Sequence, residues 1–274
     1  MAFLAGAAIA PGRPLLGYLV AGFVILAVGI AILTARRPGE VPLRSAEATR
    51  RAVSYILVYM LSFACFARVL SAAWIGEQRS PWLLALGDVM SVTFGLFAWT
   101  MVLAEGHKWR EYGFRGGRAT RFVFAMVLGI GVALLYSARR WASVSAGLVT
   151  VTPDSLVFAS VFAAIGSSFP EELLYRGFLQ GSLEGRVGRW AKVVLPALAF
   201  TAMRSVRLLP GADISPSDWL FHVLGISLPL GLWWGLMRDL AGGSLWPCLV
   251  SHFLLEFGNA LASASPHSPS AAPY

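Results

Sequence analysis

The chain has 274 residues, of which 57% are hydrophobic and only 13% are charged, and its mean hydropathy is +0.68. A soluble domain carries about 25% charged residues, so this composition excludes most soluble classes and favours a membrane protein. The formal net charge is +8, but the arginines gather at the ends of apolar stretches, which predicts membrane orientation and no nucleic-acid partner.

Apolar length predicts about eight transmembrane helices. The first, Leu15 to Thr34, contains no charge, and at about 1.5 Å per residue it matches the ~30 Å hydrocarbon layer. The fifth continues as a more polar helix to about Ser182, with Pro170 as a kink or restart. The expected helices are residues 15–34, 52–75, 82–104, 122–138, 155–169, 190–208, 218–237 and 244–263. The predicted fold class is therefore all-α, a polytopic transmembrane helix bundle.

Lysine and arginine alternate between the loops. The loops after helices one, three, five and seven hold most of them, whereas the other loops hold only Arg13, Arg79, Arg139, Arg140 and Arg207. By the positive-inside rule, the odd-numbered loops face the cytoplasm and both termini lie outside it. We therefore expect a multi-pass protein of the cell membrane, with membrane lipid as a partner.

Three parts are expected along the chain. Residues 1–150 form N-terminal transmembrane helices, residues 151–264 form a helical core that carries the candidate site, and residues 265–274 form a disordered tail rich in Ser, Ala and Pro. Both cysteines, Cys65 and Cys248, fall inside apolar segments, so neither a disulfide framework nor a thiolate metal site is expected. The oligomeric state is left open.

A charged group at membrane depth costs about 2.5–3.5 kcal/mol, so each one needs an explanation. The densest cluster begins at Pro170, where Glu172 and Arg176 lie four residues apart and are expected to pair. Glu171 points about 100° away on the helix. It lacks a local partner and is expected to be free for acid–base chemistry. An alternative is a capping box of Ser168 and Glu171 at a helix restart, with Glu172 and Arg176 as a surface pair.

A second cluster lies near the C-terminus. After Gly243-Ser-Leu-Trp-Pro, a helix places His252 and Glu256 one turn apart on one face. An imidazole and a carboxylate at this spacing can bind a divalent metal or hold an oxyanion and a water. The alternative is a packing histidine bonded to a neighbouring helix.

Together, Glu171-Glu172-x-x-x-Arg176, Gly243-Ser-Leu-Trp-Pro and His252 resemble the CAAX protease and bacteriocin-processing (CPBP, or Abi) family, over residues 155–262. The resemblance implies an intramembrane metallo-endopeptidase that acts on a peptide or membrane-protein substrate near the cytoplasmic face. It implies that Glu171 activates water, that His252 binds the metal or the oxyanion, and that Arg176 braces Glu172. Zinc or another divalent metal would be held by Glu171, His252 and Glu256.

Two positions depart from the family pattern. The motif His-x-x-x-Asn/Asp reads His252-x-x-x-Glu256, and Phe-x-x-x-His reads Phe200-x-x-x-Arg204. Arginine is neither a usable base nor a metal ligand, so either His222 or Glu256 compensates or the chain is an inactive scaffold or partner-binding relative. Convergence of the site residues on a polar cavity would favour the enzyme, whereas Arg204 filling it, paired with a carboxylate, would favour the inactive relative.

Overall fold

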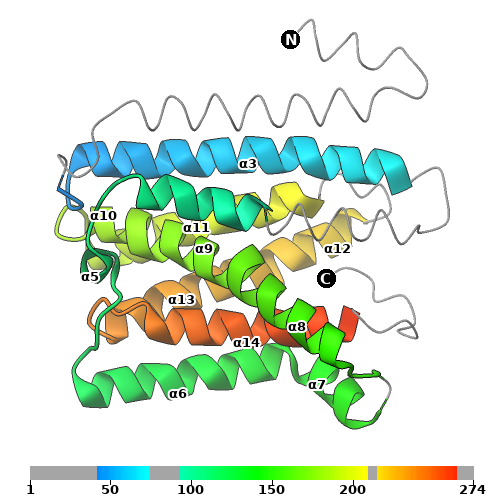
Figure 1. Ribbon diagram of the computed structural model, residues 1–274. Helices are drawn as coiled ribbons and strands as arrows, with labels where there is room; N and C mark the ends of the chain where they lie inside the picture. The colour runs from blue at the N-terminus through cyan, green and yellow to red at the C-terminus, as the bar shows by residue number, and fades with distance from the viewer. Residues whose placement is uncertain (1–41, 75–92, 148, 209–214, 264–274) are drawn as a thin grey trace, which may run out of the picture.

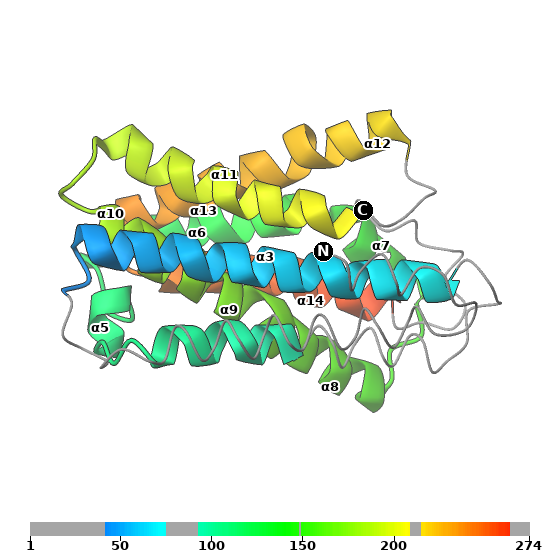
Figure 2. The ribbon, with the colours of Figure 1, turned by 90° about the horizontal axis from the view of Figure 1, so that it is seen from above.

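The computed structural model describes residues 42–74, 93–147, 149–208 and 215–263. Within these ranges every regular element is a helix, and most helices run side by side along one long direction (Figures 1 and 2). This confirms the all-α fold class. The expected helix at 15–34, the first part of the one at 82–104 and the tail at 265–274 lie outside the described residues.

Each expected helix that falls within the described ranges has a counterpart, with ends shifted by a few residues. In chain order the helices, with η for π-helical segments, are α3 (Ala46–Trp74), the helix Thr93–Leu103, α5 (Trp109–Tyr112), α6 (Ala119–Tyr136), α7 (Ala138–Ser145), α8 (Pro153–Val161), η1 (Phe162–Ser168), α9 (Phe169–Glu172), η2 (Leu173–Gln180), α10 (Gly181–Leu183), α11 (Arg189–Leu208), α12 (Pro216–Phe221), η3 (His222–Ser227), α13 (Leu228–Leu240) and α14 (Trp246–Ser263).

The segments from α8 to α10 form one continuous helix that carries the first motif. It starts at a capping box, in which the Thr152 hydroxyl accepts from the backbone N–H of Ser155 and the Ser155 hydroxyl accepts from that of Thr152. Pro170 does not end it. Proline lacks an N–H and clashes with the carbonyl four residues back, and the wider π-helical turns of η1 just before it accommodate this.

The alternative of a capping box at Ser168 is wrong. Ser168 has helical backbone angles and makes no capping hydrogen bond, because the helix does not restart there. Its hydroxyl donates instead to the carbonyl of Ala163, five residues back, at 2.5 Å, which matches the π-helical repeat.

Three helices in the described part of the chain are long and apolar enough to cross a membrane: Ala119–Tyr136, Pro153–Leu183 and Pro216–Leu240. Helices α3, α11 and α14 were also expected to cross but are not among these three, and α11 and α14 carry Arg204, His252 and Glu256 among other polar residues. These three side chains contact one another inside the bundle, where protein solvates them. The number of crossings stays a prediction.

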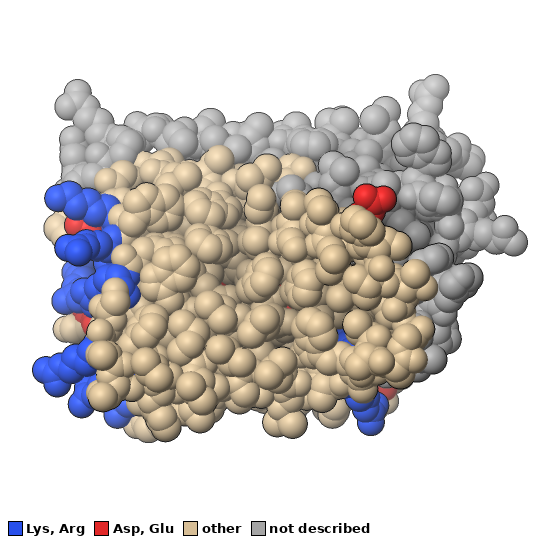
Figure 3. All heavy atoms as spheres, turned by 60° about the horizontal axis from the view of Figure 1, so that its bottom comes forward, with Lys and Arg blue, Asp and Glu red and all other residues tan. Residues whose placement is uncertain are grey.

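Basic residues gather at one end of the bundle, where the loops leading into α3, α6 and α11 meet (Figures 1 and 3). The rest of the described surface in Figure 3 carries few charged side chains. The exposed basic residues at this end are Arg44, Arg50, Lys108, Arg110, Arg115, Arg118, Arg121, Arg186 and Arg189. The loops expected on one side of the membrane therefore do lie together, and the assignment of that side to the cytoplasm stays a prediction.

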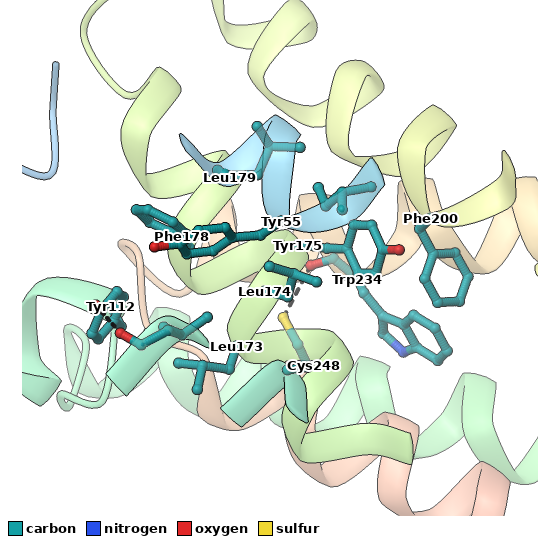
Figure 4. Close-up of a cluster of buried hydrophobic side chains, with 14 of the residues drawn as sticks. Tyr55, Tyr112, Leu173, Leu174, Tyr175, Phe178, Leu179, Phe200, Trp234 and Cys248 are labelled. Atoms are coloured by element: carbon teal, nitrogen blue, oxygen red, sulfur yellow. Dashed lines mark hydrogen bonds between the residues drawn. The ribbon is translucent and has the colours of Figure 1, made fainter. Parts of the chain in front are cut away.

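At this end of the bundle, α3 contacts the buried carboxylate of Glu105. Nη2 of Arg51 lies 2.8 Å from Oε1 of Glu105, and the Tyr55 hydroxyl donates to the same oxygen. The Tyr55 ring packs on Phe178 of η2 with 5.6 Å between centroids, and the ring of Tyr112 on α5 lies 6.2 Å from that of Phe178 in an edge-to-face contact (Figure 4). These contacts join α3 to the helix that carries the first motif.

Candidate active site

Four ionisable side chains from three helices meet inside the bundle. Glu171 comes from α9 and Arg204 from α11, while His252 and Glu256 lie one turn apart on α14. The side chains of Glu171 and His252 are 1% and 0% exposed, and that of Arg204 is 16% exposed. Arg204 is therefore the most exposed member of the cluster, whereas Glu171 and His252 are enclosed.

The terminal nitrogen Nη2 of Arg204 is the centre of the cluster. It donates to Oε2 of Glu171 and to Oε1 of Glu256, each at 2.9 Å. It also lies 3.2 Å from Nε2 of His252 and 3.2 Å from the hydroxyl of Ser167. The guanidinium thus occupies the point at which the two carboxylates and the imidazole meet. The buried ion pair that the sequence offered as an alternative is present, with both carboxylates at once.

Glu171 lacks a cation on its own helix, as expected, but it is not free, because a cation from a distant part of the chain pairs with it. Arg204 lies 33 residues further on and reaches Glu171 from the neighbouring helix. The spacing of residues along one helix could not reveal this partner. Glu171 is consequently held by a cation in this state, and it faces a water molecule only when Arg204 moves aside or shares it.

The expected pair of Glu172 and Arg176 forms, but it is buried and not on the surface. Nη1 of Arg176 donates to Oε1 of Glu172 at 3.1 Å, and both side chains are 0% exposed. Nη2 of Arg176 donates to the backbone carbonyl of Gly231 on α13 at 3.1 Å. Nδ1 of His252 lies 2.9 Å from the same carboxylate oxygen of Glu172. Glu172 therefore fixes the orientation of the imidazole and leaves Nε2 directed at the cluster.

Aromatic side chains close the cluster on the inner side. The Trp234 ring stacks on His252 at 4.0 Å between centroids and 19° between planes, and the Phe200 ring meets His252 edge-on at 6.2 Å. Figure 4 shows Phe200 and Trp234 next to each other, approached by Tyr175. The guanidinium of Arg176 lies 4.7 Å from the centroid of Phe200. These rings exclude water and hold the imidazole and the arginine in place.

Two of these residues escaped the sequence analysis. Ser167 lies one helical turn before Glu171, with its hydroxyl 3.5 Å from Oε1 of that carboxylate, and this spacing was the available signal. Trp234 offers no such signal, because a tryptophan in an apolar helix is ordinary packing until the neighbouring helix is known. Its Nε1 donates to the hydroxyl of Ser251, which in turn donates to the carbonyl of Gly129 on α6.

The residues expected to hold a metal do not fit one as they are arranged. Glu171, His252 and Glu256 each present an atom to Arg204 Nη2, so a divalent ion among them would displace a positively charged group or lie against it. The described ranges contain no group of three side chains with the arrangement of a metal site. Metal binding by this chain stays a prediction.

The order of the motifs and their meeting in one buried cluster are matched by a comparison with known families. Residues 153–258 match the family described as type II CAAX prenyl endopeptidase Rce1-like. This confirms the resemblance that the motifs indicated. The matched range, here called the Rce1-like segment, includes every member of the cluster. No curated protein and no solved structure matches the chain.

Proposed function

We propose that the chain is a membrane-embedded endopeptidase that hydrolyses peptide bonds near the cytoplasmic membrane face. The observation that carries this proposal is the meeting of Glu171, Arg204 and His252 in a buried cluster within the Rce1-like segment. A carboxylate base beside fixed donors in an enclosed site is the equipment that acyl hydrolysis requires. The substrate is a peptide or a segment of a membrane protein.

In this mechanism Glu171 accepts a proton from a water molecule while the water oxygen bonds to the peptide carbonyl carbon. The carbonyl oxygen becomes an oxyanion, and Arg204 donates to it, as does Nε2 of His252 when the imidazole carries both protons. Glu171 then returns the proton to the amide nitrogen as the C–N bond breaks, which releases an amine and a carboxylic acid. Glu172 and Arg176 do not touch the substrate, and they position His252.

The two departures from the resembled motifs fit together in this mechanism. Arginine in place of histidine adds a cation, and it pairs at 2.9 Å with Glu256, a carboxylate at the position where the resembled motif has asparagine or aspartate. The charge that Arg204 brings to the site is thereby balanced. Arginine is a strong donor to an oxyanion even though it is not a base, so the replacement changes the source of stabilisation and retains the base at Glu171.

The test is hydrolysis of a membrane-tethered, quenched fluorescent peptide by the purified full chain in nanodiscs. Glu171→Gln should lower the rate about 10²–10⁴-fold, the usual contribution of a positioned base. Glu111→Gln is the matched control, because Glu111 is 46% exposed and pairs with His107 outside the cluster. Equal activity in wild type, Glu171→Gln and Glu111→Gln would refute the assignment of Glu171.

A second candidate, a non-catalytic Rce1-like scaffold, is favoured by one observation: Arg204 already occupies the centre of the cluster. Arg204→His and Arg204→Gln separate the two candidates. For the enzyme, Arg204→Gln should lower kcat about 10²–10³-fold, as removal of one oxyanion donor does. An inert wild-type chain that gains activity in Arg204→His would instead show that Arg204 silences the native site.

A further inference from the structure

A cavity of about 510 Å³ opens at the basic end of the bundle, away from the candidate active site. It lies between the first turns of α6 and α11 and the last turn of α13. Figure 3 shows how basic side chains crowd this end of the molecule. The lining residues are Arg121, Phe124, Arg189, Asp239 and Leu240.

The cavity has an excess of positive charge. Its one carboxylate, Asp239, is already engaged by two cations: Nε of Arg189 at 2.8 Å and Nζ of Lys192 at 2.5 Å. Arg121 adds a third cation to this group, and its side chain is exposed. The lining itself holds two arginines and one carboxylate, a net charge of about +1, and the ammonium group of Lys192 beside Asp239 adds to it, which favours an anionic ligand.

The other half of the lining is apolar. Phe124 lies one helical turn after Arg121 on α6 and is 57% exposed, and Leu240 faces the same space. Helix α6 is one of the helices long and apolar enough to cross a membrane, and Arg121 is its third residue. The cations therefore lie at the level where the apolar span begins, with an exposed aromatic ring on the hydrocarbon side.

We propose that this cavity binds the phosphate of an anionic phospholipid headgroup, with the acyl chains lying along α6. Basic cavities between transmembrane helices at the interface are suited to such headgroups. A free phosphate would use the cations but leave Phe124 uncovered, whereas a lipid satisfies both halves of the lining. The assignment does not rest on the proposed peptidase activity, because the cavity shares no residue with the cluster around Arg204.

The test titrates phosphatidylglycerol or phosphatidylcholine into the full chain in detergent and measures the bound lipid by native mass spectrometry. Phosphatidylglycerol should bind preferentially, and Arg121→Gln should weaken it about fivefold, the worth of one basic side chain at an anionic surface. Arg110→Gln is the matched control. It removes the same charge from an exposed site on α5 that does not line the cavity.

Three outcomes would overturn the proposal. Equal weakening by Arg121→Gln and Arg110→Gln would reduce the effect to general surface charge. Equal binding of phosphatidylglycerol and phosphatidylcholine would show that the cavity does not distinguish an anionic headgroup from a zwitterionic one. Binding of inorganic phosphate as tight as that of phosphatidylglycerol, at constant ionic strength, would show that the acyl chains contribute nothing and would assign the cavity to a free anion.

Discussion

Nη2 of Arg204 lies 2.9 Å from Oε1 of Glu256, and these residues stand at the two positions where the motifs depart from the resembled family. The pair joins α11 to α14 across the candidate active site. Because the guanidinium of Arg204 pairs with the carboxylate of Glu256 as well as with that of Glu171, the two replacements are in direct contact. Any account of the site has to treat them together.

The first prediction follows from this pairing. Arg204→Met leaves Glu171 and Glu256 buried without their cation, and breaking such a pair costs about 3–5 kcal/mol. Adding Glu256→Gln should recover part of the loss, with a coupling of about 0.5–3 kcal/mol in a double-mutant cycle. Denaturant unfolding in detergent measures it. Strictly additive effects would mean that the pair contributes no mutual stabilisation.

The second prediction concerns metals. In the wild-type chain a chelator should leave the melting temperature unchanged, because Arg204 occupies the space between the candidate ligands. Arg204→His removes the fixed cation and adds an imidazole, so Zn²⁺ should now stabilise the variant. A free Zn²⁺ concentration of about 100 times its Kd would raise the free energy of unfolding of this variant by about 2.7 kcal/mol. A wild-type melting temperature that falls on chelation and recovers with Zn²⁺ would contradict this account.

The third prediction separates charge from geometry at Arg176. Its guanidinium donates to Glu172 and to the carbonyl of Gly231 at the same time, and it lies against Phe200. Lysine retains the charge but not the planar fork, so Arg176→Lys should destabilise the fold, though less than Arg176→Met, which leaves Glu172 buried and unpaired at a cost of about 3–5 kcal/mol. The unfolding midpoints of the two variants measure this difference. Equal losses of stability would mean that the positive charge retained by lysine contributes nothing.

Much of the fold was predictable because membrane helices correspond to long apolar stretches in the sequence. The ranges of α11 and α14 were expected to within two residues at each end. The continuous helix through Pro170 was harder, since the sequence shows the proline but not the π-helical turns that accommodate it. The orientation and the division at residues 1–150, 151–264 and 265–274 stay predictions.

The site was predictable only as far as its motifs are local. The spacing of Glu172 and Arg176 and that of His252 and Glu256 identified two pairs, and both pairs are in contact or close to it. The link between them, made by Arg204 and by the bond from His252 to Glu172, depends on how three helices pack. Glu171 was expected to be free because no cation lies near it on its own helix. The charge of a buried carboxylate can be neutralised by a residue on another helix, which the sequence alone does not reveal.

The last prediction tests the packing that supports the first motif. Gly95, on the helix Thr93–Leu103, lies so close to η1 that a Cβ atom there would overlap the carbonyl oxygen of Ile165. One turn further along, Trp99 stacks on Phe169, at 5.1 Å between centroids, directly before Pro170 and Glu171. Gly95→Ala should therefore separate the two helices and cost about 1–3 kcal/mol, as overpacking does. Because η1 leads into α9, the same change should also lower any activity that depends on Glu171.

Gly131→Ala is the matched control for this prediction. Gly131 lies inside α6, and an added Cβ there would meet nothing within 4 Å. Alanine is the better helix former by about 0.5–1 kcal/mol, so the control should be as stable as wild type or slightly more so. Thermal unfolding of both variants in the same detergent provides the comparison. Similar melting temperatures for the two variants would show that the approach of Gly95 to Ile165 is not needed, and the contact of Trp99 with Phe169 would then have to hold η1 in place by itself.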